Sequence, residues 1–166
     1  MATHIKIQTV TVGSGGAASI DFTSIPQTYT DLKIISSTTS TAASAQAQWI
    51  SFNGSTSSFS GQYLYSDTTT APSTASLARY VGTVMGTAQT ANVFNCTEIY
   101  ICNYTTSNFK SFSVDNGAEN AAAYGGLNFI AGLWSNTAAI TSISLAPNTF
   151  SYPQYSTATL YGISSS

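Results

Sequence analysis

The chain has 166 residues, a formal charge of −2 at pH 7 and 6% charged residues, where ordinary soluble proteins have about 25%. Its four cations cannot form the basic surface that follows a phosphate backbone, and no segment approaches the roughly 20 apolar residues of a membrane helix, so we expect neither nucleic acid nor membrane as a partner. The length fits one domain with a substantial core.

The low charge also indicates how the surface is used. Neutral Ser, Thr, Asn and Gln replace charged residues, which reduces the repulsion and desolvation that oppose close packing against another protein. The composition suits a subunit of an assembly, and equally an ordinary extracellular-type β-protein. The first ten residues hold no apolar run long enough for a secretory signal, so we expect no export by that route.

Residues 1–17 are predicted to form an N-terminal strand or arm that ends in a glycine hinge, and residues 18–166 a β-sandwich domain. Ile5, Ile7 and Val10 give the arm its extended pattern. A strand tethered by glycines can pair with its own domain or with a neighbour's sheet edge. His4 has no partner at a fixed spacing, so we expect a surface residue and no catalytic triad or histidine metal site.

The stretch 20–35 is the clearest local signal, and it predicts a strand, a fixed corner and a second strand. Two apolar runs flank a centre of Ser, Thr, Gln and Pro that cannot continue a helix. Pro26 fixes its own φ, and Asp31 is expected to steady the turn by bonding nearby backbone. Leu32 and Ile34 share one face, which is typical of an antiparallel sheet with one wet side.

The middle of the chain is predicted to contain a hairpin that turns at Asn53 and Gly54. Ile50 and Phe52 alternate with Trp49 and stop at this Asn-Gly turn signal. Further strands are expected at 61–65, 77–85 and 93–102.

The C-terminal half reads as further short strands. We expect a strand at 109–114 that ends in a hairpin turn at 115–117, a helical turn at 118–123, and a strand at 124–134 that its glycines bend or bulge. Trp134 and Leu160 are predicted core residues. Roughly ten short strands and no helical period predict an all-β fold, an antiparallel, jelly-roll-like β-sandwich.

Cys96 and Cys102 have the same parity in one predicted strand, which separates them by roughly 20 Å. We therefore expect free, partly buried thiols and no disulfide, unless the chain bends between them.

No pattern of catalytic residues stands out. The carboxylates occur singly, and Asp31 and Asp115 are interpreted as turn residues. We therefore expect no enzymatic activity, no cofactor and no metal. Aromatic residues, which suit protein interfaces or stacking on sugars, are the remaining functional candidates. The candidate interface residues are Ile5, Ile7, Val10, Tyr63, Tyr65, Tyr152 and Tyr155.

Five segments, in this order, resemble small virion structural proteins of tailed bacteriophages that are common among phages of aquatic bacteria. They are IDFTSIPQTYTDLKI at 20–34, FNG at 52–54, NYTTSNFKSF at 103–112, GLWSNTAAITSISL at 132–145 and STATLYGI at 156–163. The basic residue that this family usually has after the first segment is absent, since 36–45 contains only Ser, Thr and Ala. No binding role is carried over for that loop.

The resemblance implies a non-enzymatic capsid decoration or cement subunit, present in the virion as a homotrimer after synthesis in the host bacterial cytoplasm. Its partner would be the major capsid protein, or a tail protein. The alternative is a tail-fibre or receptor-binding module that binds a host glycan, and an enzyme domain with a dispersed acid site comes third. The absence of a repeating shaft pattern favours decoration over a fibre.

Overall fold

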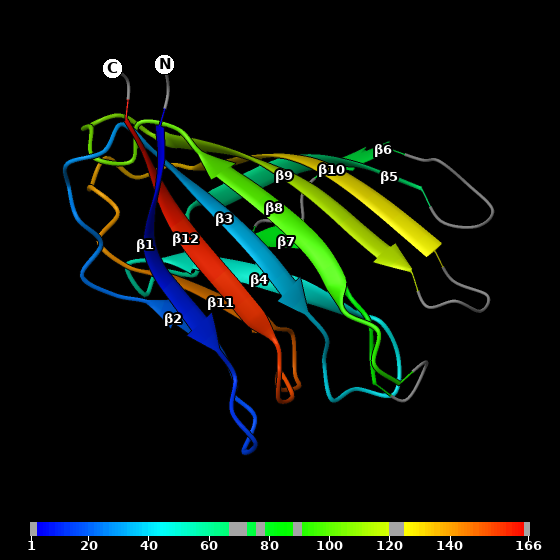
Figure 1. Cartoon of the computed structure of the whole chain (residues 1–166). Coiled ribbons are helices and arrows are strands. Elements are labelled where there is room, and N and C mark those ends of the chain that lie inside the picture. Colours follow the sequence, from blue (N-terminus) through cyan, green and yellow to red (C-terminus); the bar gives the residue numbers. More distant parts are fainter. Residues whose placement is uncertain (1–2, 67–72, 76–78, 88–90, 120–124, 165–166) are drawn as a thin grey trace.

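The computed structural model describes residues 3–66, 73–75, 79–87, 91–119 and 125–164. For residues 73–75 only the backbone is described. Within these residues the regular structure consists of β-strands (Figure 1). The strands are β1 Thr3–Thr11, β2 Ile20–Phe22, β3 Asp31–Thr38, β4 Gln46–Phe52, β5 Phe59–Ser66, β6 Ser73–Ala75, β7 Tyr80–Val84, β8 Asn95–Ile101, β9 Lys110–Glu119, β10 Gly125–Trp134, β11 Ile143–Pro147 and β12 Thr157–Ser164.

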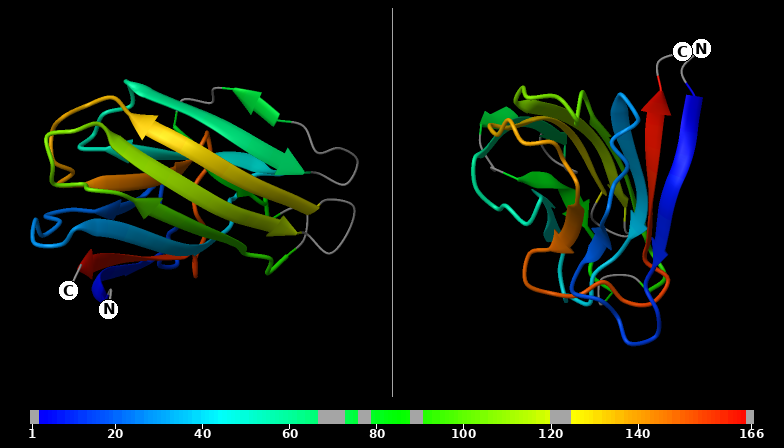
Figure 2. Two further views of the ribbon diagram at one scale, coloured as in Figure 1. Left: turned by 90° about the horizontal axis from the view of Figure 1, so that it is seen from above. Right: turned by 90° about the vertical axis from the view of Figure 1, so that its left-hand side faces the viewer.

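Two antiparallel sheets of unequal size pack face to face as a β-sandwich, which confirms the predicted fold class (Figures 1 and 2). The large sheet has eight strands in the order β1-β12-β3-β8-β9-β10-β5-β6, and the small sheet has four in the order β2-β11-β4-β7. The finer assignment to a jelly roll stays a prediction.

The segment 20–35 links the two sheets. β2 lies at an edge of the small sheet, and β3 lies inside the large sheet between β12 and β8. The predicted corner around Pro26 therefore carries the chain from one layer of the sandwich to the other. Leu32 and Ile34 are buried and Ile35 is exposed, as expected of a sheet with one wet side.

β1 pairs with β12 of its own chain. The register runs from Thr3 opposite Ser164 to Thr11 opposite Thr157, with one irregularity between Lys6 and Gln8. β1 is thus the outermost strand of the large sheet, and its N-terminal end lies beside the C-terminal end of β12 (Figure 2). The sequence left open whether this strand pairs with its own domain or with a neighbour, and in the structure it pairs with its own domain.

The Asn-Gly turn forms, but it does not make a hairpin between neighbouring strands. Asn53 and Gly54 have φ of 52° and 72°, as a type I′ turn requires. The amide of Ser55 donates to the carbonyl of Phe52 at 2.9 Å. The next strand, β5, belongs to the other sheet, so the chain crosses between layers after this turn.

The turn predicted at 115–117 is wrong. β9 continues without interruption from Lys110 to Glu119 and pairs with β8 and β10 throughout this region. Residues 118 and 119 of the predicted helical turn are strand, and 120–123 lie outside the described residues. β10 keeps a regular register against β9 and β5, so the predicted bulge is also wrong.

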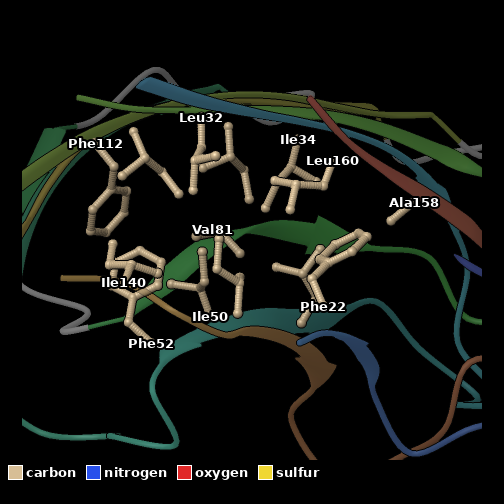
Figure 3. Packing of buried hydrophobic residues seen from close by; sticks show 14 of the residues in the cluster. Phe22, Leu32, Ile34, Ile50, Phe52, Val81, Phe112, Ile140, Ala158 and Leu160 are labelled. Atoms are coloured by element: carbon tan, nitrogen blue, oxygen red, sulfur yellow. The ribbon is translucent and has the colours of Figure 1, made fainter. Parts of the chain in front are cut away.

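The core fills the space between the two sheets. Figure 3 shows Phe22 and Ile50 of the small sheet pointing toward Leu32 and Leu160 of the large one. Trp134 and Leu160 are buried, as predicted. Three aromatic rings surround Phe52, with their centroids 5.4–5.8 Å from the Phe52 centroid. They belong to Phe59, Phe112 and Trp134.

The side chain of Asn116 joins the two sheets through buried hydrogen bonds. Its Oδ1 accepts from the Thr83 amide at 2.9 Å and from Asn128 Nδ2 at 2.9 Å. Its Nδ2 donates to the Thr83 carbonyl at 3.2 Å and to Thr97 Oγ1 at 2.8 Å. Gly82, with φ of 115°, leaves room for this amide, since a Cβ there would lie 2.4 Å from Asn116 Cγ. Asn116, which the sequence placed in a turn, thus connects the two sheets from inside the sandwich.

The side chain of Lys110 is fully buried and connects two loops. Its Nζ donates to the carbonyls of Thr106 at 2.7 Å, Asn108 at 2.5 Å and Thr137 at 3.5 Å. Burial lowers the pKa of the ammonium group. The three carbonyls compensate part of the cost of removing the charge from water.

Candidate interaction surface

The predicted interface residues do not form one surface. Ile5, Ile7 and Val10 lie on β1, at one edge of the large sheet, whereas Tyr63 and Tyr65 lie on β5 near the opposite edge. Ile5 is exposed, and Ile7 and Val10 are half-buried. Any single partner that covered both edges would have to span the whole sheet.

The two tyrosines between β11 and β12 have different surroundings. Tyr152 is fully buried, and its hydroxyl accepts from Gln48 Nε2 at 2.7 Å. Burial raises its pKa. Its assignment to an interface is therefore corrected, because its ring packs in the core. Tyr155 is 69% exposed and is available to a partner.

Tyr63 and Tyr65 belong to an aromatic group that bridges the two sheets. Their rings stack with centroids 5.3 Å apart, and Tyr63 lies 5.4 Å from Tyr80 of β7 in an edge-on arrangement. Tyr80 in turn contacts Trp49, and the Arg79 guanidinium lies 5.1 Å from the Trp49 ring centroid. Burial, with a smaller effect of Tyr65, raises the pKa of Tyr63. Both tyrosines are half-buried, so they help to close this side of the sandwich, and their role in an interface stays a prediction.

An exposed apolar patch lies on the outer face of the large sheet, and sequence reasoning missed it. Leu64 of β5 is 51% exposed, and Leu127 and Phe129 of β10 are 52% and 51% exposed. Phe129 lies directly opposite Leu64 across the two strands. Exposed apolar side chains that gather in this way mark interaction surfaces.

The patch continues into an acidic region along a single row of cross-strand neighbours. Phe129 lies opposite Asp115 of β9, and Asp115 lies opposite Glu98 of β8. Glu98 bonds Lys33 of β3, with 2.8 Å between Oε1 and Nζ. Asp115, interpreted from the sequence as a turn residue, is instead an exposed carboxylate in the middle of a sheet face.

Two of the depressions that border Phe129 lie between strands of this face. The larger, of about 420 Å³, lies toward β5 and has Leu64, Gln62 and Ala131 in its wall. The smaller, of about 160 Å³, lies toward β8 and is lined by Glu98, Tyr100, Ser113, Val114, Asp115 and Phe129. Phe129 is thus a ridge between an apolar and an acidic hollow.

Asp31 steadies the end of β8 beside this face. Its carboxylate accepts from the Tyr100 hydroxyl at 2.6 Å and from the Asn103 amide at 2.7 Å. The hydrogen bond to Asp31, together with burial, raises the pKa of Tyr100 to about 12. Burial also raises the pKa of the Cys102 thiol. The predicted contact of Asp31 with backbone is present, but it reaches a distant strand end instead of its own turn.

The described residues contain no group of three or more His, Cys, Asp or Glu side chains that could hold a metal ion. Both cysteines are free, Cys96 exposed and Cys102 half-buried. The arrangement on the outer face supplies shape, apolar area and the carboxylates of Asp115 and Glu98, which are the means of binding a protein surface. The sequence does contain a signal for the exposed apolar patch. In residues 127–134 both faces of the strand carry apolar side chains, Leu127 and Phe129 on one face and Ile130 and Trp134 on the other.

The fold is a β-sandwich, and the outer face of its large sheet carries an exposed apolar patch suited to binding. In comparisons with known proteins, no family model, curated protein or solved structure matches the chain. No helix in the described part of the chain is long and apolar enough to cross a membrane.

Proposed function

We propose that this chain is a non-enzymatic structural protein of a tailed-phage virion, a decoration or cement subunit that binds the major capsid protein through the outer face of its large sheet. The observation that carries the proposal is the exposed apolar patch of Leu64, Leu127 and Phe129 on the broad outer face of the large sheet. Seven of its eight strands have 7 to 10 residues, and at a spacing of about 4.8 Å the whole face offers on the order of 900 Å². A partner would have to cover most of it to reach the roughly 800 Å² per partner of a stable interface.

The resemblance of five ordered sequence segments to small phage virion proteins supports the same proposal. The homotrimer is part of the proposal on that ground alone. The segments include the corner between β2 and β3 and the loop held by Lys110, so the similarity covers parts that shape the sandwich.

The test is to count and locate the protein in purified virions. Quantitative mass spectrometry should find hundreds of copies per particle, and gold-labelled antibodies should mark the capsid. A double variant, Leu64→Ser with Phe129→Ser, should fold but be lost from particles. Phe150→Ser is the matched control, since it removes an exposed ring from the loop between β11 and β12. A few tens of copies confined to the tail would refute the decoration role.

The alternative, a tail module that binds host glycans, has one observation in its favour. Tyr155 is highly exposed beside Gln154, and an exposed aromatic ring next to an amide is the arrangement that stacks on and bonds a sugar. Binding on a glycan array that Tyr155→Ala abolishes would favour this alternative over decoration.

A further inference from the structure

We propose that the outer face of the large sheet recognises an apolar segment of a different protein that carries one arginine. The guanidinium would enter the acidic hollow between Asp115 and Phe129, and the neighbouring apolar side chains would cover Leu64 and Leu127. The inference rests on the proposed function in one respect, that this face is where the partner attaches.

The need for a cation follows from the charges in the row. Asp115 and Glu98 are direct cross-strand neighbours, and like charges in such positions destabilise a sheet. Lys33 pairs with Glu98, whereas Asp115 has no ion pair among the described residues. A cation from the partner would relieve this repulsion and gain a charge-assisted hydrogen bond.

The shape and lining of the hollow favour arginine. The hollow has a volume of about 160 Å³ and opens onto the sheet face, so a side chain of a partner can enter it. Phe129 forms one wall and the Asp115 carboxylate another. A guanidinium can stack on the ring while it bonds the carboxylate, which the compact ammonium of lysine does less well.

A second copy of this chain does not supply the arginine. Arg79 lies over Trp49, and of the three lysines Lys33 is paired and Lys110 is buried. Lys6 remains, opposite Tyr161 in a strand pair that is otherwise polar on this face, where Thr9 bonds Thr159 at 2.9 Å. That surface does not complement the apolar patch.

The test uses the purified full-length chain and synthetic peptides. Each 15-residue peptide has the same apolar run with Arg, Lys, Gln or Glu at its centre, immobilised on an array. Wild type should bind the Arg peptide about two- to fivefold better than the Gln peptide, as expected of one exposed ion pair, and the Glu peptide least. Asp115→Lys should reverse this order, and Phe129→Ser should weaken binding to all four peptides.

Asp21→Lys is the matched control, because it makes the same charge change at an exposed carboxylate on the small sheet. It should keep the wild-type order, and circular dichroism should show every variant folded. Equal binding of the four peptides by wild type, or an Arg preference that survives Asp115→Lys, would overturn the inference. So would a dimer in sedimentation that Asp115→Lys dissociates, since the occupant would then be a second copy.

The two proposals fail in different ways. The peptides are synthetic, so their binding order does not depend on where the protein resides. If the protein prefers the Arg peptide but is located in the tail, the inference stands and the capsid role is refuted. If the protein is located on the capsid but shows no such preference, the capsid role stands and the inference is refuted.

Discussion

Asn116 shows how one residue can serve the opposite purpose from its usual one. An Asn-Gly pair beside alternating apolar and polar residues is a strong turn signal. Here the Asn116 amide is fully buried and bonds both backbone groups of Thr83 in β7, as a neighbouring strand would. The sequence could not reveal this, because the signal depends on neighbours in the chain whereas the role depends on a strand of the other sheet.

We predict that Asn116→Ala lowers the free energy of unfolding by about 2–4 kcal/mol, because both backbone groups of Thr83 lose a buried partner. Chemical denaturation measures this directly. The exposed neighbour Asp115→Ala removes a carboxylate that faces Glu98, so it should leave stability unchanged or raise it by less than about 1 kcal/mol. Equal effects of the two variants would show that the Asn116 hydrogen bonds contribute nothing.

Tyr100 gives a prediction for alkaline pH. Its pKa in the folded chain is about 12, against 10.0 for an ordinary tyrosine, so between these values the folded state holds a proton that the unfolded state has lost. The stabilisation is therefore complete below about pH 10 and disappears as the pH rises toward 12.

We expect Tyr100→Phe to lose stability at neutral pH and to show a shallower decline between pH 10 and 12 than wild type, in urea unfolding followed by circular dichroism. Tyr161→Phe, which removes a phenol elsewhere on the large sheet, serves as the control. Parallel declines for wild type and Tyr100→Phe would show that the bond to Asp31 does not hold the proton.

At the scale of elements, strand patterns that depend on neighbours in the sequence were predictable. The alternation of Leu32 with Ile34 and the burial of Leu160 follow from period-two patterns. The choice of sheet for each strand was not predictable, because a turn such as Asn53-Gly54 fixes a reversal but not the layer that the next strand joins. The interface residues were the least predictable: Tyr152 and Tyr155 have similar surroundings in sequence and opposite exposure.

β1 is the element for which the structure changes an expectation. An arm that reaches a neighbour could be deleted without harm to the fold, but β1 pairs with β12 along its length, and Val12, just after it, is buried. We predict that deletion of residues 2–12 lowers the melting temperature by several degrees or more and exposes β12 as a new edge. Thermal unfolding and sedimentation check this. An unchanged melting temperature would favour an arm that serves another subunit.

For the whole molecule, few charges imply weak dependence on salt. The proposed contact combines the exposed apolar patch with one ion pair at Asp115, and an exposed pair contributes at most about 1 kcal/mol. Raising NaCl from dilute to half-molar should therefore weaken attachment to capsids by no more than about fivefold, as measured by co-sedimentation. Release of the protein from particles by moderate salt alone would count against an apolar interface.

The pairing of β1 with β12 also bears on where the chain can be cut. Thr3 lies opposite Ser164, so a short linker can join the two ends without disturbing either sheet. New ends can be opened in the exposed loop at 56–58, where the chain passes between layers. Such a circular permutant would keep every strand pair of the sandwich while making β1 and β12 a local hairpin, and the outermost pair of the large sheet would then form early in folding instead of waiting for the two ends of the chain to meet.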